Sequence, residues 1–516
     1  MEQRASLVLV LHSHIPYCRK QGVWPFGEEW VFEAMADTYV PMLDMLAAVP
    51  LRHAESSGSR NPILSVAVSP VLCEQLRDDY MTKRFVEYID SRIAAAEADV
   101  AHHLEVHDDI MAGIARGYLE RCIDVKHSFL DRWGSDLVGA FRYFAAEGII
   151  EVLATAATHA YLPLLDDEGR VRAQLKTGIL SCEHHFGLKP RAAWLPELGY
   201  SPGAIDSVLQ ELGIECVLVD PSSLATSDRP LGAASLVVYT LARTGMSVLV
   251  RDDTTVAQVW SSDTGYPGDG SYREFHKRHD VSGIPYWRVT SKLTDLNYKQ
   301  LYSAEQAAET VRRHAEHFCE FIADRAQQRP GAVIVAPFDM ELFGHWWHEG
   351  IAWLSHVIRI LSEGAGPRLA SVSAASRDGA SGGVVELVDG SWGEGAVHSA
   401  WANERTEAMW RSLKEAQSLR SRLEQARAQG RFGNGEQELA SQACRELLLA
   451  EASDWPFLVS VGQAADYAMA RFDGHIGNFT RLAMAAMDGA DDAAMAALSD
   501  IAARDALFGW APASYL

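Results

Sequence analysis

Short apolar runs alternate with long helical stretches over most of the chain, and this alternation constrains the fold more than any other sequence feature. The apolar runs are residues 7–11, 63–68, 149–153, 192–195, 215–219 and 332–336. Such runs are typical of strands that are buried on both faces of a sheet. The stretches between them, such as residues 170–186 and 303–325, carry apolar residues at helical spacing. The alternation therefore predicts an α/β architecture with a parallel sheet.

Side chains suited to catalysis or binding directly follow several of these runs. They are His12, His159, Glu197 and Asp339. A (β/α) barrel concentrates its active site at the carboxyl ends of its strands, which favours a barrel for this chain. An open doubly wound sheet is the competing fold. No GxGxxG loop follows the first run and no Walker motif occurs, so a nucleotide site would lack its usual loop.

Residues 331–350, GAVIVAPFDMELFGHWWHEG, carry one half of a predicted site. Pro337 ends the apolar run, and the carboxylates Asp339 and Glu341 follow, next to a segment with two histidines and two tryptophans. An acid at the end of a buried strand beside aromatic rings is the arrangement that a sugar-cleaving site needs. Alternatively, these acids cap the next helix.

The sequence WLPELGY, around Glu197, repeats the pattern of an apolar run, a proline, an acid, a glycine and an aromatic residue. Glu197 and Asp339 could therefore act as the two carboxylates of glycoside cleavage. A retaining enzyme holds these groups about 5–5.5 Å apart, one as nucleophile and the other as general acid/base. Their environments must differ, because the acid has to stay protonated while the nucleophile stays ionised.

His12 and His14 lie in the motif HSHIPY, where an extended chain directs both side chains to the same side. Such a pair can contact a sugar, bind a metal ion or lie satisfied in a core. A metal site would also need Asp, Glu or His ligands at later strand ends. From this motif alone, sugar contact and metal binding both remain open. His159, in the motif THAYLP, is a further candidate for hydrogen bonding to sugar hydroxyls.

The 14 tryptophans supply flat apolar faces that suit pyranose rings. The candidates for this role are Trp24, Trp260, Trp346, Trp347, Trp392 and Trp401. A net charge of −23 argues against nucleic acid or an anionic membrane as partner, because phosphate binding needs a basic surface. A neutral polysaccharide is compatible with this acidity.

The remaining segments complete the predicted organisation. The expected elements are a hairpin over residues 236–240 and 247–250, loops over 252–260 and 264–272, and a linker or surface loop over 364–383. After Asn403 the pattern becomes helical, and apolar residues at helical spacing from Met409 to Leu423 predict a core-facing stripe.

The seven cysteines are scattered, without a CxxC pair or zinc-type spacing. This indicates a reducing compartment and no disulfide framework. The first residues contain too short an apolar run for a signal peptide, and no run of about 18 apolar residues occurs, so no membrane span is predicted. We therefore expect a soluble cytoplasmic protein.

Five motifs in chain order together resemble glycoside hydrolase family 57. They are HSHIPY, EVLATAATHAYLPLL, WLPELGY, APFDMELFGHWWHEG, and SDWPF with AADYA. Within that family the chain is most similar to the 1,4-α-glucan branching enzyme group, through VWPFGEEWVFEA early and SWGEG with a following tryptophan late. The resemblance covers essentially the whole chain.

The resemblance implies an incomplete (β/α)7 barrel formed by residues 1–197 and 262–390. It also implies a small inserted domain over residues 198–261 and a helical C-terminal domain over residues 391–516. The mechanism that it implies needs no metal and no other cofactor, which weakens the metal interpretation of the HSH motif.

Carried onto this chain, the resemblance implies Glu197 as nucleophile and Asp339 as general acid/base of a retaining enzyme. Such an enzyme cleaves α-1,4 bonds and transfers the chain to form α-1,6 branches. Glu341 is left with a supporting role. The substrate-binding residues that the resemblance implies are His12, His14, Trp24, His159, Trp260, Trp346, Trp392, Trp401 and Asp454. The expected partner is an α-glucan such as amylose or glycogen.

One segment departs from the branching enzyme pattern. Those enzymes carry a tyrosine on a flexible loop over the cleft, whereas residues 228–240 are short here and contain one tyrosine, Tyr239. A cleft open to water favours hydrolysis, so an amylase-like α-glucan hydrolase is the alternative function. Two alternatives come from other classes: a non-catalytic glucan-binding protein, and a metal-dependent deacetylase or amidohydrolase that uses His12 and His14.

Overall fold

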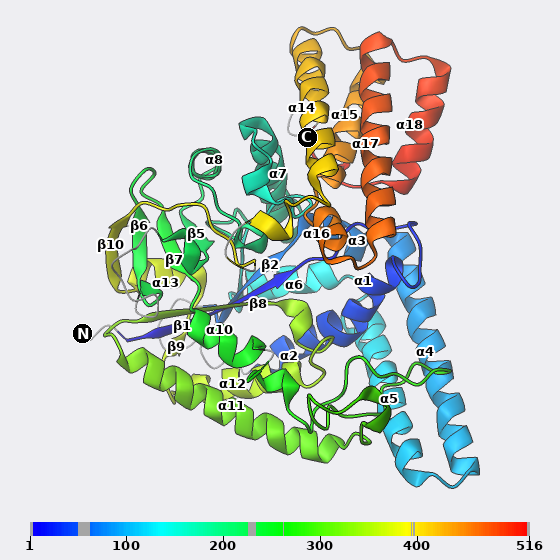
Figure 1. Cartoon of the computed structure of the whole chain (residues 1–516), viewed down its shortest axis with the longest axis vertical. Helices are drawn as coiled ribbons and strands as arrows, with labels where there is room; N and C mark the ends of the chain where they lie inside the picture. The colour runs from blue at the N-terminus through cyan, green and yellow to red at the C-terminus, as the bar shows by residue number, and fades with distance from the viewer. Residues whose placement is uncertain are drawn as a thin grey trace.

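The chain forms an α/β part and a group of C-terminal helices that stands on one side of it (Figure 1). The computed structural model describes residues 4–49, 62–224, 234–261, 263–393, 395 and 398–512. The expected α/β class with a helical C-terminal part is confirmed.

The strands of the α/β part belong to two sheets. The strands are β1 (Ser6–Ser13), β2 (Leu64–Val68), β3 (Ile150–Val152), β4 (Ala192–Ala193), β5 (Cys216–Val219), β6 (Val238–Leu241), β7 (Ser247–Val250), β8 (Val333–Asp339), β9 (Arg368–Leu369) and β10 (Ser381–Val385). One sheet has the order β3-β2-β1-β8, with β9 paired to the start of β1, and the other has the order β10-β6-β7-β5-β4. Every pair is parallel except β6 with β7, which form the predicted hairpin.

Two isolated parallel bridges join the sheets. Ala154, just after β3, pairs with Ala193 of β4, and Arg251, just after β7, pairs with Val335 of β8. The order of parallel strands therefore runs β8-β1-β2-β3, continues through β4-β5-β7, and returns to β8. One buried hydrophobic cluster contains side chains from both sheets, including Val10 and Trp194, so the sheets share a core.

Strand β8 extends beyond the expected end at Pro337 and stops at Asp339. Its pairing with β1 is unbroken from Val333 to Asp339, which lies opposite His12. The prediction that the proline ends the strand was wrong. On the other edge of β8 the pairing with Arg251 stops at Val335, so the missing N–H of Pro337 interrupts no ladder there.

Helices surround this strand arrangement. Those of the α/β part are α1 (Glu28–Ala34), α2 (Val40–Ala48), α3 (Pro70–Arg77), α4 (Asp79–Glu105), α5 (Asp109–His127), α6 (Leu137–Ala146), α7 (Glu168–Ser181), α8 (Ala204–Glu211), α10 (Asp253–Trp260), α11 (Ala304–Gln327), α12 (Gly350–Ser362) and α13 (Val372–Asp378). Helices α4 and α5 form a long antiparallel pair that projects at one side of the molecule (Figure 1).

The C-terminal helices pack around their own core. They are α14 (Glu407–Ala428), α15 (Asn434–Ala450), α16 (Asp454–Val461), α17 (Ala465–Asp488) and α18 (Asp492–Arg504). Met409, Leu413 and Leu423 of α14 are buried in this core, which confirms the predicted stripe. Tyr17 of the α/β part belongs to the same cluster, so the two parts pack directly against each other.

Two loop predictions were wrong. Residues 253–260 form α10, because Asp252 caps the helix through Thr255 and is itself fixed by a buried ion pair with Arg325 at 2.5 Å. The expected linker over 364–383 contains β9 and α13, whose small apolar side chains are buried against the shared core of the sheets. The small residues of this segment therefore allow close packing and do not mark a flexible connection.

Residues 198–261, expected as an inserted domain, supply β5, β6 and β7 to the same sheet as β4. Of the short segment 228–240, residues 228–233 lie outside the described part of the chain. Tyr239 lies in β6, is buried, and donates a hydrogen bond to the carbonyl of Ala234 at 3.0 Å. Its hydroxyl is therefore held inside the fold and not over a cleft.

All seven cysteines are buried and unpaired. Over the part of the chain that the structure describes, no helix combines the length and the apolar character needed to cross a membrane.

Candidate active site

Glu197 lies on a tight turn directly after β4. Both Glu197 and Leu198 have left-handed backbone conformations, with φ of 59° and 48°, which residues other than glycine rarely adopt. Gly199 closes the turn by donating to the carbonyl of Pro196 at 2.9 Å. A Cβ at Gly199 would lie 2.6 Å from the ring of Tyr161, so only glycine fits. The strained turn fixes the direction of the Glu197 carboxylate.

Asp339 ends β8 and shares a cavity of about 540 Å³ with Glu197. The walls of this cavity, here called the catalytic cleft, include Trp260, Trp392 and Trp401. The structure thus brings together two acids that are far apart in the sequence and surrounds them with indole rings.

The two carboxyl groups differ in their tendency to ionise. Burial raises the pKa of Glu197 to about 7, while the indole N–H of Trp392, which donates to Oε2 at 2.6 Å, works in the opposite direction. Burial raises the pKa of Asp339 well above its usual value, and the charges of Glu341 and Glu197 add to this. Burial thus favours the protonated form of Asp339, and the Trp392 N–H favours the ionised form of Glu197.

Glu341 is buried behind this pair. Its Oε1 accepts hydrogen bonds from Ser13 Oγ at 2.7 Å and from the Tyr39 hydroxyl at 2.5 Å. These bonds anchor the side chain to β1 and to the helical segment after α1, so Glu341 acts on Asp339 through its charge.

Three histidines form a stack next to Glu197. The ring centroid of His159 lies 4.7 Å from that of His12 and 4.1 Å from that of His14, and Trp194 continues the stack 5.1 Å from His12. His159 Nδ1 lies 3.9 Å from Glu197 Oε1. Burial lowers the pKa of His12 to about 3 and that of His159 well below its usual value, so both rings are neutral.

The C-terminal part holds this histidine stack. Asp454 Oδ2 lies 2.8 Å from His14 Nε2, whose other ring nitrogen lies 2.8 Å from Ser69 Oγ. Ser453 Oγ lies 2.9 Å from His159 Nδ1. Sequence reasoning named Asp454 but missed Ser453, although both belong to the motif SDWPF that marked this segment.

The predicted tryptophans are distributed unevenly. Trp401 is buried and stacks on Tyr161 at 4.1 Å, while Trp260 is 48% exposed and meets Trp346 edge-on at 5.7 Å. Trp347 is a core residue. Trp24 is 76% exposed and is not among the side chains that line the catalytic cleft.

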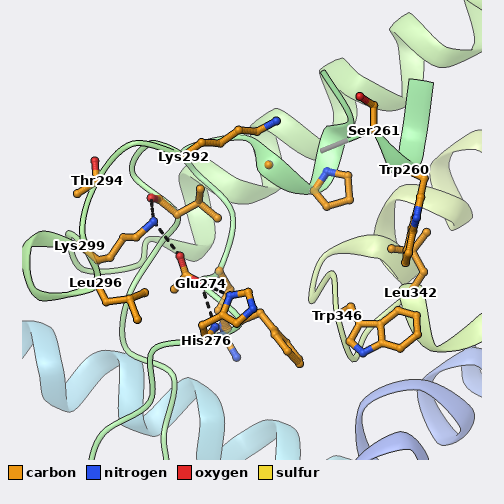
Figure 2. Close-up of a pocket in the computed structure, with 15 residues that line it drawn as sticks. Trp260, Ser261, Glu274, His276, Lys292, Thr294, Leu296, Lys299, Leu342 and Trp346 are labelled. Atoms are coloured by element: carbon orange, nitrogen blue, oxygen red, sulfur yellow. Dashed lines mark hydrogen bonds and ion pairs between the residues drawn. The ribbon is translucent and has the colours of Figure 1, made fainter. Parts of the chain in front are cut away.

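A second cavity, of about 770 Å³, adjoins the catalytic cleft at Trp260, which borders both. Figure 2 shows Trp260 and Trp346 on one side of it and Lys299, Glu274 and His276 on the other. Lys299 Nζ lies 2.9 Å from Glu274 Oε2, so these two charges neutralise each other. The aromatic surface therefore continues beyond the two acids.

Arg251 is a further cleft residue that sequence reasoning missed. Its Nη2 lies 2.6 Å from Asp220 Oδ2 and 2.8 Å from Asp253 Oδ1. No sequence motif marks this arginine, which lies between the predicted hairpin and the predicted loop that begins at Asp252.

Among the described residues, one group of three potential metal ligands lies close together: Glu446, His475 and Asp505. Both ring nitrogens of His475 are already hydrogen-bonded, Nδ1 to Glu446 at 2.7 Å and Nε2 to Arg471 at 2.8 Å. The group is therefore a buried hydrogen-bond network of the helical part. His12 and His14 do not belong to it.

Paired acids with raised pKa values, set in an aromatic cleft at the ends of parallel strands, define an enzyme of the glycoside-cleaving type. Comparison with known proteins agrees. The chain belongs to glycosyl hydrolase family 57, whose family model matches residues 8–382. A second model, described as the C-terminal part of 1,4-alpha-glucan branching enzymes, matches residues 401–515.

Similar proteins cover nearly the whole chain. The 1,4-alpha-glucan branching enzyme of Thermococcus kodakarensis is 37% identical, over 93% of this chain and 73% of the relative. A probable 1,4-alpha-glucan branching enzyme of Mycobacterium tuberculosis is 30% identical, over 97% of this chain and 96% of the relative.

Solved structures of similar proteins agree with this fold. A branching enzyme of the family from Pyrococcus horikoshii has a TM-score of 0.88 at 36% identity, covering 99% of this chain and 96% of that chain. An alpha-amylase from Thermotoga maritima has a TM-score of 0.86 at 27% identity, covering 99% of both chains.

Proposed function

We propose that this protein is a 1,4-α-glucan branching enzyme, which cleaves α-1,4 bonds and transfers the released chain to form α-1,6 branches. The observation that carries the proposal is the pair of acids in one aromatic cleft, where burial favours the protonated form of Asp339 and an indole N–H donates to Glu197. The names of the relatives, and the match of residues 401–515 to the C-terminal part of branching enzymes, point to the same activity.

The mechanism retains the anomeric configuration. Asp339 donates its proton to the glycosidic oxygen while the Glu197 carboxylate attacks the anomeric carbon, which gives a covalent glycosyl-enzyme and a free chain end. Asp339, now ionised, accepts the proton of a 6-hydroxyl group on an acceptor glucan, and that oxygen displaces Glu197. The raised pKa of Asp339 suits the acid, and the indole N–H on Glu197 suits the nucleophile.

The substrate-binding roles are part of the proposal. The neutral rings of His12 and His159, together with His14 and Asp454, hydrogen-bond sugar hydroxyls beside Glu197. Trp260, Trp346, Trp392 and Trp401 stack on pyranose rings along the cleft and the adjoining cavity, and exposed Trp24 contacts a more distant part of the glucan.

The fold proposal is that β1-β2-β3-β4-β5-β7-β8 form an incomplete (β/α)7 barrel, supported by the bridges between the two sheets. We draw the domain boundary near residue 400, with β5 and β7 kept in the barrel rather than in an inserted domain. Seven unpaired cysteines support a reducing compartment, so the proposed location is the cytoplasm. The proposed pathway, synthesis of a glycogen-like glucan, follows from the proposed branching activity.

The alternative function is α-glucan hydrolysis. It is favoured by the likeness to an alpha-amylase and by the burial of Tyr239, which leaves the described part of the short segment without a tyrosine over the cleft. Water reaching the glycosyl-enzyme would then replace the acceptor hydroxyl.

Product linkage separates the two functions. The purified protein is incubated with amylose, reducing ends are counted before and after debranching, and α-1,6 linkages are measured by proton NMR. Branching predicts few new reducing ends before debranching and many after it. New reducing ends without an α-1,6 signal would contradict the proposal and favour hydrolysis.

A further inference from the structure

A cavity of about 590 Å³ lies away from the two acids, at the junction of the α/β and helical parts. It is bordered by the loop before α7 and by the start of α14, which lie side by side (Figure 1). Two hydrogen bonds join these elements: Gln417 Nε2 donates to Asp167 Oδ2 at 2.7 Å, and Arg420 Nη2 donates to the Gly169 carbonyl at 3.4 Å. We call this space the junction pocket.

The junction pocket combines an indole ring with separate polar groups. Trp410 borders it and is partly buried, and its Nε1 donates to the Trp401 carbonyl at 2.8 Å, which fixes the ring. Glu404 and Lys414 also border the pocket and are exposed. Within the described ranges, neither side chain has a hydrogen-bond or ion-pair partner, so both are available to a ligand.

A buried arginine provides the second observation. Arg170 borders the junction pocket and is 2% exposed. Its Nε donates to Glu451 Oε1 at 2.7 Å and its Nη1 donates to the Leu165 carbonyl at 3.3 Å. Its Nη2 has no hydrogen-bond partner among the described residues. A buried donor left unsatisfied is costly, and a ligand hydroxyl would relieve this cost.

The junction pocket and the catalytic cleft are connected through shared supports. Trp410 is bonded to Trp401, which borders the cleft. Glu451, the partner of Arg170, is two residues before Ser453, which holds the histidine stack. The two spaces therefore share supports from the same C-terminal segments.

We infer that the junction pocket binds a short segment of a second α-glucan chain, separate from the chain in the catalytic cleft. An indole face with dispersed donors and acceptors suits a pyranose ring, and the volume lies in the range of small-ligand sites. The exposed acids Asp166, Glu404 and Glu407 outnumber the exposed Lys414, which disfavours an anionic ligand. The choice of an α-glucan rests on the proposed function.

The test counts binding sites for maltoheptaose by calorimetric titration of the full chain. A Glu197→Gln background prevents turnover, and Glu404→Ala and Lys414→Ala are added singly and together. The expected result is about two sites in the background protein, with the second weakened about tenfold in the double variant. Glu415→Ala, at an exposed position of α14 that does not border the pocket, is the matched control and should leave both sites unchanged.

Other outcomes overturn the inference. A single site in the background protein, or two sites that the double variant leaves unchanged, would show that the junction pocket does not bind the glucan. Absence of both sites in the background protein, together with absence of α-1,6 products from the protein that keeps Glu197, would refute the proposed function as well. Trp410→Ala is a second variant, accepted only if its thermal unfolding matches the background, and it should weaken the same site.

Discussion

Replacing Trp392 by phenylalanine should shift the pH dependence of the reaction toward higher pH. The indole N–H donates to Glu197 Oε2 at 2.6 Å and stabilises the ionised carboxylate. A hydrogen bond to a charged group contributes about 1.5–3 kcal/mol, which corresponds to about one to two pH units. Phenylalanine keeps the ring but cannot donate, so the pKa of Glu197 should rise above its value of about 7.

The direction of the shift follows from the roles of the acids. Activity requires Glu197 ionised and Asp339 protonated, so kcat/KM rises with pH as Glu197 loses its proton and falls as Asp339 loses its own. In Trp392→Phe, only the rising limb of the kcat/KM profile should move to higher pH. The profile of kcat/KM against pH, measured with a soluble maltooligosaccharide, reports this.

Trp260→Phe is the matched control, since Trp260 borders the same cleft and makes no hydrogen bond to either acid. It should weaken substrate binding and leave the rising limb in place. An unmoved limb in a folded Trp392→Phe protein would refute the reasoning, because the limb would then not report Glu197 ionisation.

Two further predictions concern the surroundings of the acids. Glu341→Gln should lower the pKa of Asp339 and move the falling limb of the profile down by about one unit, since a neighbouring negative charge is removed; an unmoved falling limb would contradict this. Gly199→Ala should destabilise the fold by about 1–3 kcal/mol in chemical denaturation, because its Cβ would meet the buried ring of Tyr161. Gly474→Ala, where a Cβ meets nothing within 4 Å, should not destabilise, and equal stability of the two variants would argue against the close contact.

The sequence predicted the strands well because buried parallel strands leave a strong local signal. Apolar runs located β1, β2, β5 and the hairpin, and the acids at the ends of β4 and β8 could be paired as one site. The end of β8 was predicted too early, at Pro337. Only the pairing pattern shows that this proline lies beyond the last paired residue on one edge of the strand, where its missing N–H is tolerated.

Other features depended on contacts between distant residues. Helix α13 looked like a linker because small residues that pack closely resemble those of a flexible segment. Ser453 and Arg251 reach the site only through the packing of distant segments, which spacing alone does not reveal. The raised pKa values of the two carboxyl groups also arise from burial, which no local motif encodes.

The measurement that tests the central claim most directly is capture of the covalent intermediate on Glu197. The Asp339→Asn variant is mixed with α-maltosyl fluoride, whose fluoride leaves without protonation, and the protein is analysed by intact mass and peptide mapping. The proposed mechanism predicts a maltosyl group on the peptide that contains Glu197, and none when Glu197→Gln is added. A folded, substrate-binding Asp339→Asn protein that carries the maltosyl group on another residue, or that releases maltose of inverted configuration without an adduct, would contradict the account.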